Sequence, residues 1–131
     1  DPKMRGLIAW LRSTSKPQVL GYGSVWWNGL TAPLVADYLV ELAYTRHTGI
    51  MHLFGSRMTK YGILKQTQEV YRWNFPHIIP SSVPVSDRTL SSVRTDRILL
   101  PNTFDFRAQL EEMKSLQKGF SDGWRASVYQ S

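Results

Sequence analysis

Two carboxylates one helical turn apart are the most informative ionisable residues of this chain. Asp37 and Glu41 interrupt an otherwise apolar run over residues 34–44, and their i, i+4 spacing places them on one face of a helix. Such a pair can share a proton or carry one through a membrane. It can also bond Lys or Arg of a neighbouring element, or lie on the wet edge of a mostly buried helix. We predict that Asp37 and Glu41 form ion pairs with a partner.

Two short motifs have the spacing of nucleotide-dependent enzymes. Residues 21–23 (Gly-Tyr-Gly) begin like a dinucleotide fingerprint after a possible strand at 17–20. Trp26 then stands where that motif requires a small residue, so we interpret the glycines as a turn. Tyr61 and Lys65 have the Tyr-x-x-x-Lys spacing of short-chain dehydrogenases, but the cofactor half of such an enzyme is missing. Neither motif predicts a cofactor.

Metal and nucleophile chemistry have no pattern to support them. His47, His52 and His77 do not fall at i, i+4, and no carboxylate completes a facial triad with them. The chain has no Cys, which excludes thiolate metal sites, disulfides and cysteine nucleophiles. No Gly-x-Ser-x-Gly turn and no Walker loop is present. We therefore predict no catalytic, cofactor-binding or metal-binding residues, and a protein that is not an enzyme.

Basic and aromatic residues alternate over residues 60–73, as they do on single-stranded RNA surfaces. The pattern is weak, because Tyr61 and Tyr71 also form the apolar face of their own helix. A net charge of +6 is modest for a dedicated nucleic-acid binder. Nucleic acid is therefore kept as an alternative partner.

The composition is low in charge and rich in aromatic residues. In 131 residues, the length of one domain, 20% are charged, while five Trp, six Tyr and five Phe need burial. These large side chains suit a surface that is covered by partner proteins, where Trp, Tyr and Arg are favoured. The chain begins at Asp1 rather than Met, as a processed form or a trimmed fragment would.

The first half of the chain predicts two apolar helices. Residues 3–12 form a stripe with the i, i+3, i+4, i+7 spacing, either a basic helix on a membrane surface or a short packed helix; its members are Met4, Leu7, Ile8 and Leu11. A second helix is expected to begin at Thr31 as N-cap with Pro33 in its first turn. Carried on to Phe54 it would measure roughly 33 Å, enough to span a bilayer, although a buried core helix fits equally well. Trp26 and Trp27, just before it, are predicted to lie at a membrane interface.

The second half predicts two more helices separated by an irregular segment. One helix is expected over residues 57–73, and another from a cap at Asn102 or Thr103 to about Gly119, with an apolar stripe at Phe106, Leu110, Met113 and Leu116. Residues 74–101 contain four prolines and no helical periodicity. We expect this segment to be an extended arm lying across a partner.

The sequence thus predicts a mainly α protein with three to four helices plus a long irregular proline-punctuated arm, and not a compact independent globule. Its parts would be residues 1–73 (helical, basic, associated with a membrane or partner), 74–101 (arm) and 102–131 (C-terminal helix and tail). The predicted function is a non-catalytic accessory subunit of a large organellar membrane complex. We place it in the mitochondrial inner membrane, in the respiratory chain or ATP synthase, with other subunits and lipid as partners. The alternative is a small basic protein of a ribonucleoprotein such as an organellar ribosome.

Overall fold

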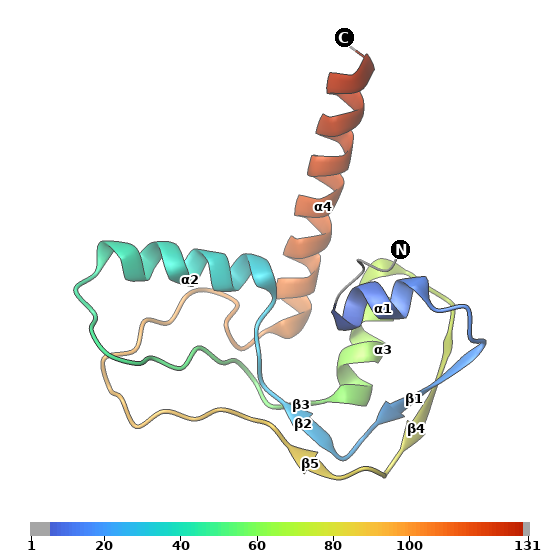
Figure 1. Ribbon diagram of the computed structural model, residues 1–131, viewed down its shortest axis with the longest axis horizontal. Helices are drawn as coiled ribbons and strands as arrows, with labels where there is room; N and C mark the ends of the chain where they lie inside the picture. The colour runs from blue at the N-terminus through green and yellow to red at the C-terminus, as the bar shows by residue number, and fades with distance from the viewer. Residues whose placement is uncertain (1–5, 130–131) are drawn as a thin grey trace. The chain divides into compact units, whose positions relative to one another are not determined.

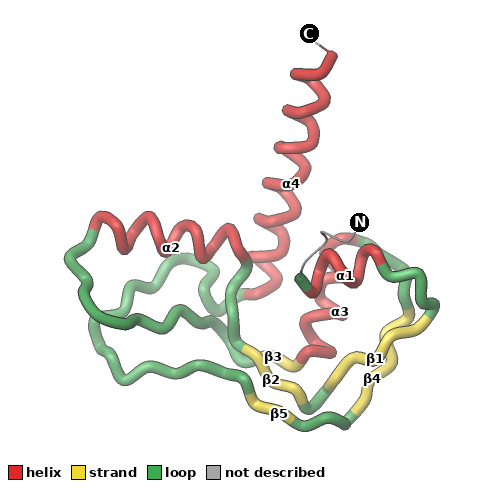
Figure 2. Tube along the Cα trace, in the orientation of Figure 1, coloured by secondary structure: helices red, strands yellow, loops and turns green. Residues whose placement is uncertain are grey.

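The chain has a mixed α/β fold. The computed structural model describes the backbone of residues 6–129 and the side chains of residues 6–119. Over this range the chain forms four helices and five short strands, and the strands make two small sheets (Figures 1 and 2). The prediction of a mainly α chain was wrong, because short segments near residues 18–27 and 77–87 pair with one another across the sequence.

The chain divides into two compact units, each made of two segments. Unit 1 comprises residues 1–28 and 57–90, and unit 2 comprises residues 29–56 and 91–131. In unit 1 the side chain of Asn28 donates to the Leu90 carbonyl and accepts from the Leu90 N–H, both at 2.8 Å. Asn28 and Leu90 are the last residues of the two segments of unit 1. The buried amide of Asn28 therefore joins the two segments at the positions where the chain passes from unit 1 into unit 2.

The larger part of unit 1 is a parallel pair of strands covered by helices. β1 (Gln18–Tyr22) lies beside β4 (His77–Ser81), and α3 (Lys60–Tyr71) packs on both strands, with α1 (Leu7–Ser13) against α3. The strand expected at residues 17–20 is thus confirmed. The buried apolar core comprises Leu11, Val19, Leu64 and Ile78, with Leu7, Tyr61 and Trp73 packed against it.

Gly21 brings β1 and α3 close together. A Cβ atom at this position would lie 2.5 Å from Cδ2 of Tyr61 and 2.7 Å from Cγ2 of Ile78. Only glycine allows the helix to approach the strand at this distance. Residues 23–24 then form a turn into β2 (Val25–Trp27), so the interpretation as a turn is right for Gly23 and wrong for Gly21, which lies within β1.

A second sheet in unit 1 has β2 as its central strand. β3 (Met58–Thr59) pairs antiparallel with β2, and β5 (Ser86–Asp87) pairs parallel with it. β4 and β5 both come from residues 74–101, so the prediction of an extended arm was wrong for this part of the segment. Pro80 lies within β4 and has no backbone N–H to donate. It is tolerated because β4 is an edge strand, so one side of its backbone has no neighbouring strand that requires a donor.

Unit 2 is built on α2 (Ala32–Tyr44) and the first turns of α4 (Phe106–Tyr129), which pack together (Figure 1). Leu34, Tyr38, Phe106 and Leu110 are buried there. The expected start of α2 at Thr31, with Pro33 in the first turn, is confirmed, although the Thr31 side chain makes no capping bond. The continuation of α2 to Phe54 was wrong, because the backbone becomes extended at Thr45.

The two remaining helix predictions are confirmed with different ends. α3 begins after Thr59, whose hydroxyl accepts from the Gly62 N–H at 3.0 Å, and residues 57–59 before it are not helical. α4 begins after Asp105, whose carboxylate accepts from the Ala108 N–H at 3.0 Å, so neither Asn102 nor Thr103 is the cap. α4 also continues through Gly119, since a lone glycine weakens a helix without ending it.

Within residues 6–129 the structure contains no helix that is both long and apolar enough to cross a membrane. The N-terminal helix is described from Leu7 onward, and the predicted contribution of Met4 to its stripe lies outside the described residues. Leu11 of that stripe is buried in the core of unit 1, whereas Trp10 is exposed.

Candidate functional site

The outward side of α2 is an apolar helix surface that the described residues of unit 2 leave uncovered. Leu39 and Val40 are 58% and 56% exposed, and Ala36 and Ala43 beside them are also exposed. The four residues have the i, i+3, i+4, i+7 spacing of one helical stripe. We call this surface the α2 outer face. Its small residues, Ala36 and Ala43, leave room for another backbone to approach closely.

Asp37 and Glu41 follow one margin of the α2 outer face. Asp37 lies between the exposed Val40 and the buried Leu34, whereas Glu41 lies next to Leu34, at the edge of the side that carries Leu34 and Tyr38. Both carboxylates are exposed to solvent, and the ion pairs formed among the described residues involve other acids. The structure therefore places the two predicted residues together on one accessible edge, as their spacing required.

α2 is held in place by a glutamine of α4. Gln109 is 1% exposed, and its Oε1 accepts from the Thr31 N–H at 3.0 Å and from the Thr31 hydroxyl at 3.5 Å. Its Nε2 donates to the carbonyls of Asn102 and Thr103 at 2.9 and 3.0 Å. One side chain thus satisfies polar groups at the start of α2 and in the loop before α4.

The buried phenol of Tyr38 makes a second connection. Its hydroxyl lies 2.6 Å from the Thr103 hydroxyl and accepts from the Leu100 N–H at 3.2 Å. Tyr38 and Gln109 therefore anchor the inner side of α2 to the same loop. Because the inner side is fixed, the apolar stripe on the opposite side must face outward.

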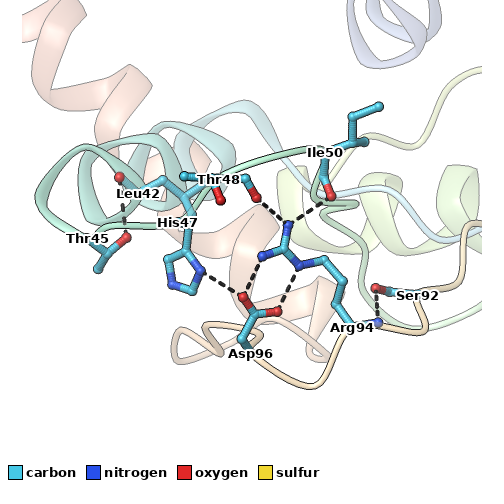
Figure 3. Close-up of polar contacts among 8 residues, drawn as sticks. All are labelled: Leu42, Thr45, His47, Thr48, Ile50, Ser92, Arg94 and Asp96. Atoms are coloured by element: carbon cyan, nitrogen blue, oxygen red, sulfur yellow. Dashed lines mark hydrogen bonds and ion pairs between the residues drawn. The ribbon is translucent and has the colours of Figure 1, made fainter.

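A polar cluster in unit 2 gathers residues that are far apart in the sequence (Figure 3). Arg94 donates to both carboxylate oxygens of Asp96, with Nε 2.8 Å from Oδ1. The same guanidinium donates to the carbonyls of Thr48 and Ile50 at 2.8 and 3.1 Å. His47 Nδ1 lies 3.3 Å from the other oxygen of Asp96. We call this set the Arg94 clamp.

The Arg94 clamp is a structural device. The hydrogen bonds from Arg94 hold the pKa of the Asp96 carboxyl well below its usual range, and Asp96 in turn raises the pKa of Arg94. A histidine beside a carboxylate is one half of a catalytic triad, but the nearby Thr45 hydroxyl donates to the Leu42 carbonyl at 3.3 Å. The clamp therefore fixes the loop after α2 against residues 91–97.

Trp26 and Trp27 lie in unit 1, on opposite faces of the strand β2. The Arg57 guanidinium stands 3.8 Å from the centre of the Trp26 ring and donates to Asp87 at 3.1 Å. Hydrogen bonds from Thr89, followed by the one from Arg57, lower the pKa of the Asp87 carboxyl. Both indoles are half-buried. Their predicted position at a membrane interface stays a prediction.

Charge is divided unequally between the two units. The segments of unit 1 contain nine Lys and Arg against three Asp and Glu, whereas the segments of unit 2 contain seven of each. The whole formal net charge of +6 therefore belongs to unit 1. Among the described residues, no three His, Asp or Glu side chains come together as metal ligands would.

Comparison with known proteins finds no relative. No protein-family model matches the chain, and neither a curated protein nor a solved structure matches it. The function is therefore inferred from the residues alone. Sequence reasoning found the α2 acids from their spacing, but it missed Gln109 and the Arg94 clamp, because each also binds a segment 44 to 78 residues away, at Thr31 or at Thr48 and Ile50.

Proposed function

We propose that the protein is a non-catalytic accessory subunit of a large organellar membrane complex. The complex would lie in the mitochondrial inner membrane, as part of the respiratory chain or the ATP synthase. The observation that supports this proposal is the α2 outer face. An exposed apolar helix stripe, with two accessible carboxylates on the same helix, suits the docking of another protein.

The partner that fits the α2 outer face is a helix of another subunit. Ala36 and Ala43 allow close helix packing, and Leu39 and Val40 supply the apolar contact. Lys or Arg residues one turn apart on the partner would meet Asp37 and Glu41. Each ion pair between an acid of α2 and a cation of the partner would then be partly desolvated. It would therefore contribute more to the binding free energy than an exposed surface ion pair does.

Two further features fit a setting beside a membrane. The net charge of unit 1 suits an anionic surface, and Trp26 and Trp27 supply rings of the kind found at membrane–water interfaces. Lipid is therefore proposed as a partner in addition to protein subunits.

The proposal is tested by removing both acids and measuring assembly. In native electrophoresis of detergent-extracted organelles, the double variant Asp37→Ala/Glu41→Ala is expected to migrate separately from the complex. The turnover of each complex that still assembles should change little. Glu111→Ala/Glu112→Ala removes two acids from α4 as a matched control and should stay assembled. Normal assembly with collapsed proton transport in the Asp37/Glu41 variant would overturn the proposal in favour of a carboxylate relay.

The second candidate is a small basic protein of a ribonucleoprotein such as an organellar ribosome. The concentration of net charge in unit 1 favours it, since phosphate neutralisation requires clustered Lys and Arg. The conditions that release the protein from its assembly distinguish the two candidates. Release by high salt or nuclease would support the ribonucleoprotein, and a requirement for detergent with co-purifying lipid would support the membrane complex.

A further inference from the structure

The loop between β4 and β5 presents aliphatic side chains to solvent. Val83 and Val85 are 68% and 79% exposed, and Ser82 and Pro84 are exposed beside them. The Ser81 hydroxyl donates to the Val83 carbonyl at 2.8 Å and accepts from the Val83 N–H at 3.4 Å. These bonds hold the backbone of Val83 against Ser81, and both valines are turned to solvent. We call this loop the valine tip.

The valine tip lies beside the turn between β1 and β2. The Gly23 N–H donates to the Ser81 carbonyl at 2.8 Å, on one side of the tip. On the other side, the Ser86 N–H donates to the Ser24 carbonyl at 3.0 Å. Figure 1 shows these two turns next to each other at the same end of unit 1. The tip is thus supported by two sheets.

Three cations border this end of unit 1. The Lys60 ammonium is 5.3 Å from the ring centre of Tyr22, the residue that pairs with Ser81. Arg57 stands over Trp26, and the exposed Arg88 donates its backbone N–H to the Trp26 carbonyl at 2.9 Å. Asp87, which Arg57 and Thr89 bind, is the acid among them.

We propose that the valine tip and its bordering cations bind an anionic membrane surface. Val83 and Val85 would enter the boundary between headgroups and acyl chains, while Lys60, Arg57 and Arg88 would meet lipid phosphates. A single-stranded nucleic acid would meet the same cations, but it is bound by stacking on aromatic rings. The most exposed apolar groups here are aliphatic and offer no such ring, so the residues favour lipid. This inference rests on the lipid contact proposed above for unit 1 and locates it at the valine tip, and it uses none of the residues of the α2 outer face.

A single fluorescent label tests the insertion directly. Because the chain has no Cys, Val83→Cys in the full-length protein provides one labelling site for an environment-sensitive dye. Vesicles of phosphatidylcholine mixed with cardiolipin should shift the emission to the blue and raise its intensity, and phosphatidylcholine vesicles should not. Val93→Cys, at a fully exposed valine of unit 2, should show no shift. An unchanged spectrum at position 83 with cardiolipin would overturn the proposal.

Binding by variants then separates the two contributions. Val83→Ser/Val85→Ser should weaken co-sedimentation with cardiolipin vesicles about tenfold, because two aliphatic groups are lost from the interface. Lys60→Gln should weaken it about fivefold and reduce its salt dependence. Val93→Ser is the matched control. Equal binding by wild type and the double valine variant would contradict the proposal, and so would tight binding to an oligoribonucleotide without binding to vesicles.

Discussion

Replacing Gln109 with methionine tests how α2 is held, and the structure allows the cost to be worked out. Methionine has a similar length and fills the same space, so the change removes hydrogen bonds and leaves little cavity. The Thr31 N–H, the Thr31 hydroxyl and the Thr103 carbonyl lose the hydrogen bonds that they form with Gln109. The Asn102 carbonyl keeps a bond from the Asp105 N–H at 3.1 Å.

Three buried polar groups therefore become unsatisfied, at roughly 1–3 kcal/mol each and least for the long bond of the Thr31 hydroxyl. We expect unit 2 to lose about 3 kcal/mol of stability. Hydrogen exchange of the helical amides in α2 and α4 reports on this unit, and exchange through unfolding should become roughly 150-fold faster. Amides of α3, in unit 1, provide the internal reference.

Gln66 of α3 offers a matched control with the opposite expectation. Its Oε1 is buried and has no hydrogen-bond partner among the described residues. Gln66→Met removes an unsatisfied acceptor, so the stability of unit 1 should stay the same or rise by up to about 1 kcal/mol. A loss below about 1 kcal/mol in Gln109→Met, or equal losses in the two variants, would refute the assignment of Gln109 as the anchor of α2.

Two further predictions concern glycine packing and acid stability. Gly21→Ala should destabilise unit 1 by about 2 kcal/mol in urea unfolding, because the new Cβ meets Tyr61, whereas Gly119→Ala has open space and should stabilise α4 by about 0.5–1 kcal/mol. A neutral Gly21→Ala would show that the close approach is not needed. The pKa of Asp96 is lower in the folded state than its ordinary value of about 3.9, so its contribution is present above that value and is lost as the pH falls below it. Asp96→Asn should therefore flatten the loss of unit 2 stability below about pH 4, and an unchanged acid slope would count against the Arg94 clamp.

The helices were predictable from local signals. The start of α2 follows from Thr31 and Pro33, and the existence of α3 and α4 follows from their apolar spacing. The exact ends of the helices were not predictable. At α4, for example, Asn102 and Thr103 are capping residues as suitable by type as Asp105, which is the cap in the structure. The periodicity of a helix relates residues three or four positions apart, so it can be recognised in one sequence without knowledge of the fold.

The strands and most of the polar anchors were not predictable in this way. β3 and β5 have two residues each, and their pairing with Trp26 joins segments about 33 and 61 residues away. Four prolines made residues 74–101 read as an irregular arm, although an edge strand such as β4 accommodates Pro80. At the site, the i, i+4 spacing revealed Asp37 and Glu41, but burial alone decides which apolar residues of α2 face outward.

The most direct test of the proposed function is to identify what covers Leu39 in the cell. A photo-crosslinking amino acid in place of Leu39, on the α2 outer face, would be activated in intact mitochondria, with the same substitution at Val93 as control. We predict a crosslink from position 39 to a subunit of an inner-membrane complex, at a helical peptide that carries Lys or Arg one turn apart. Crosslinks to ribosomal components or RNA, or the same products from positions 39 and 93, would contradict the proposal.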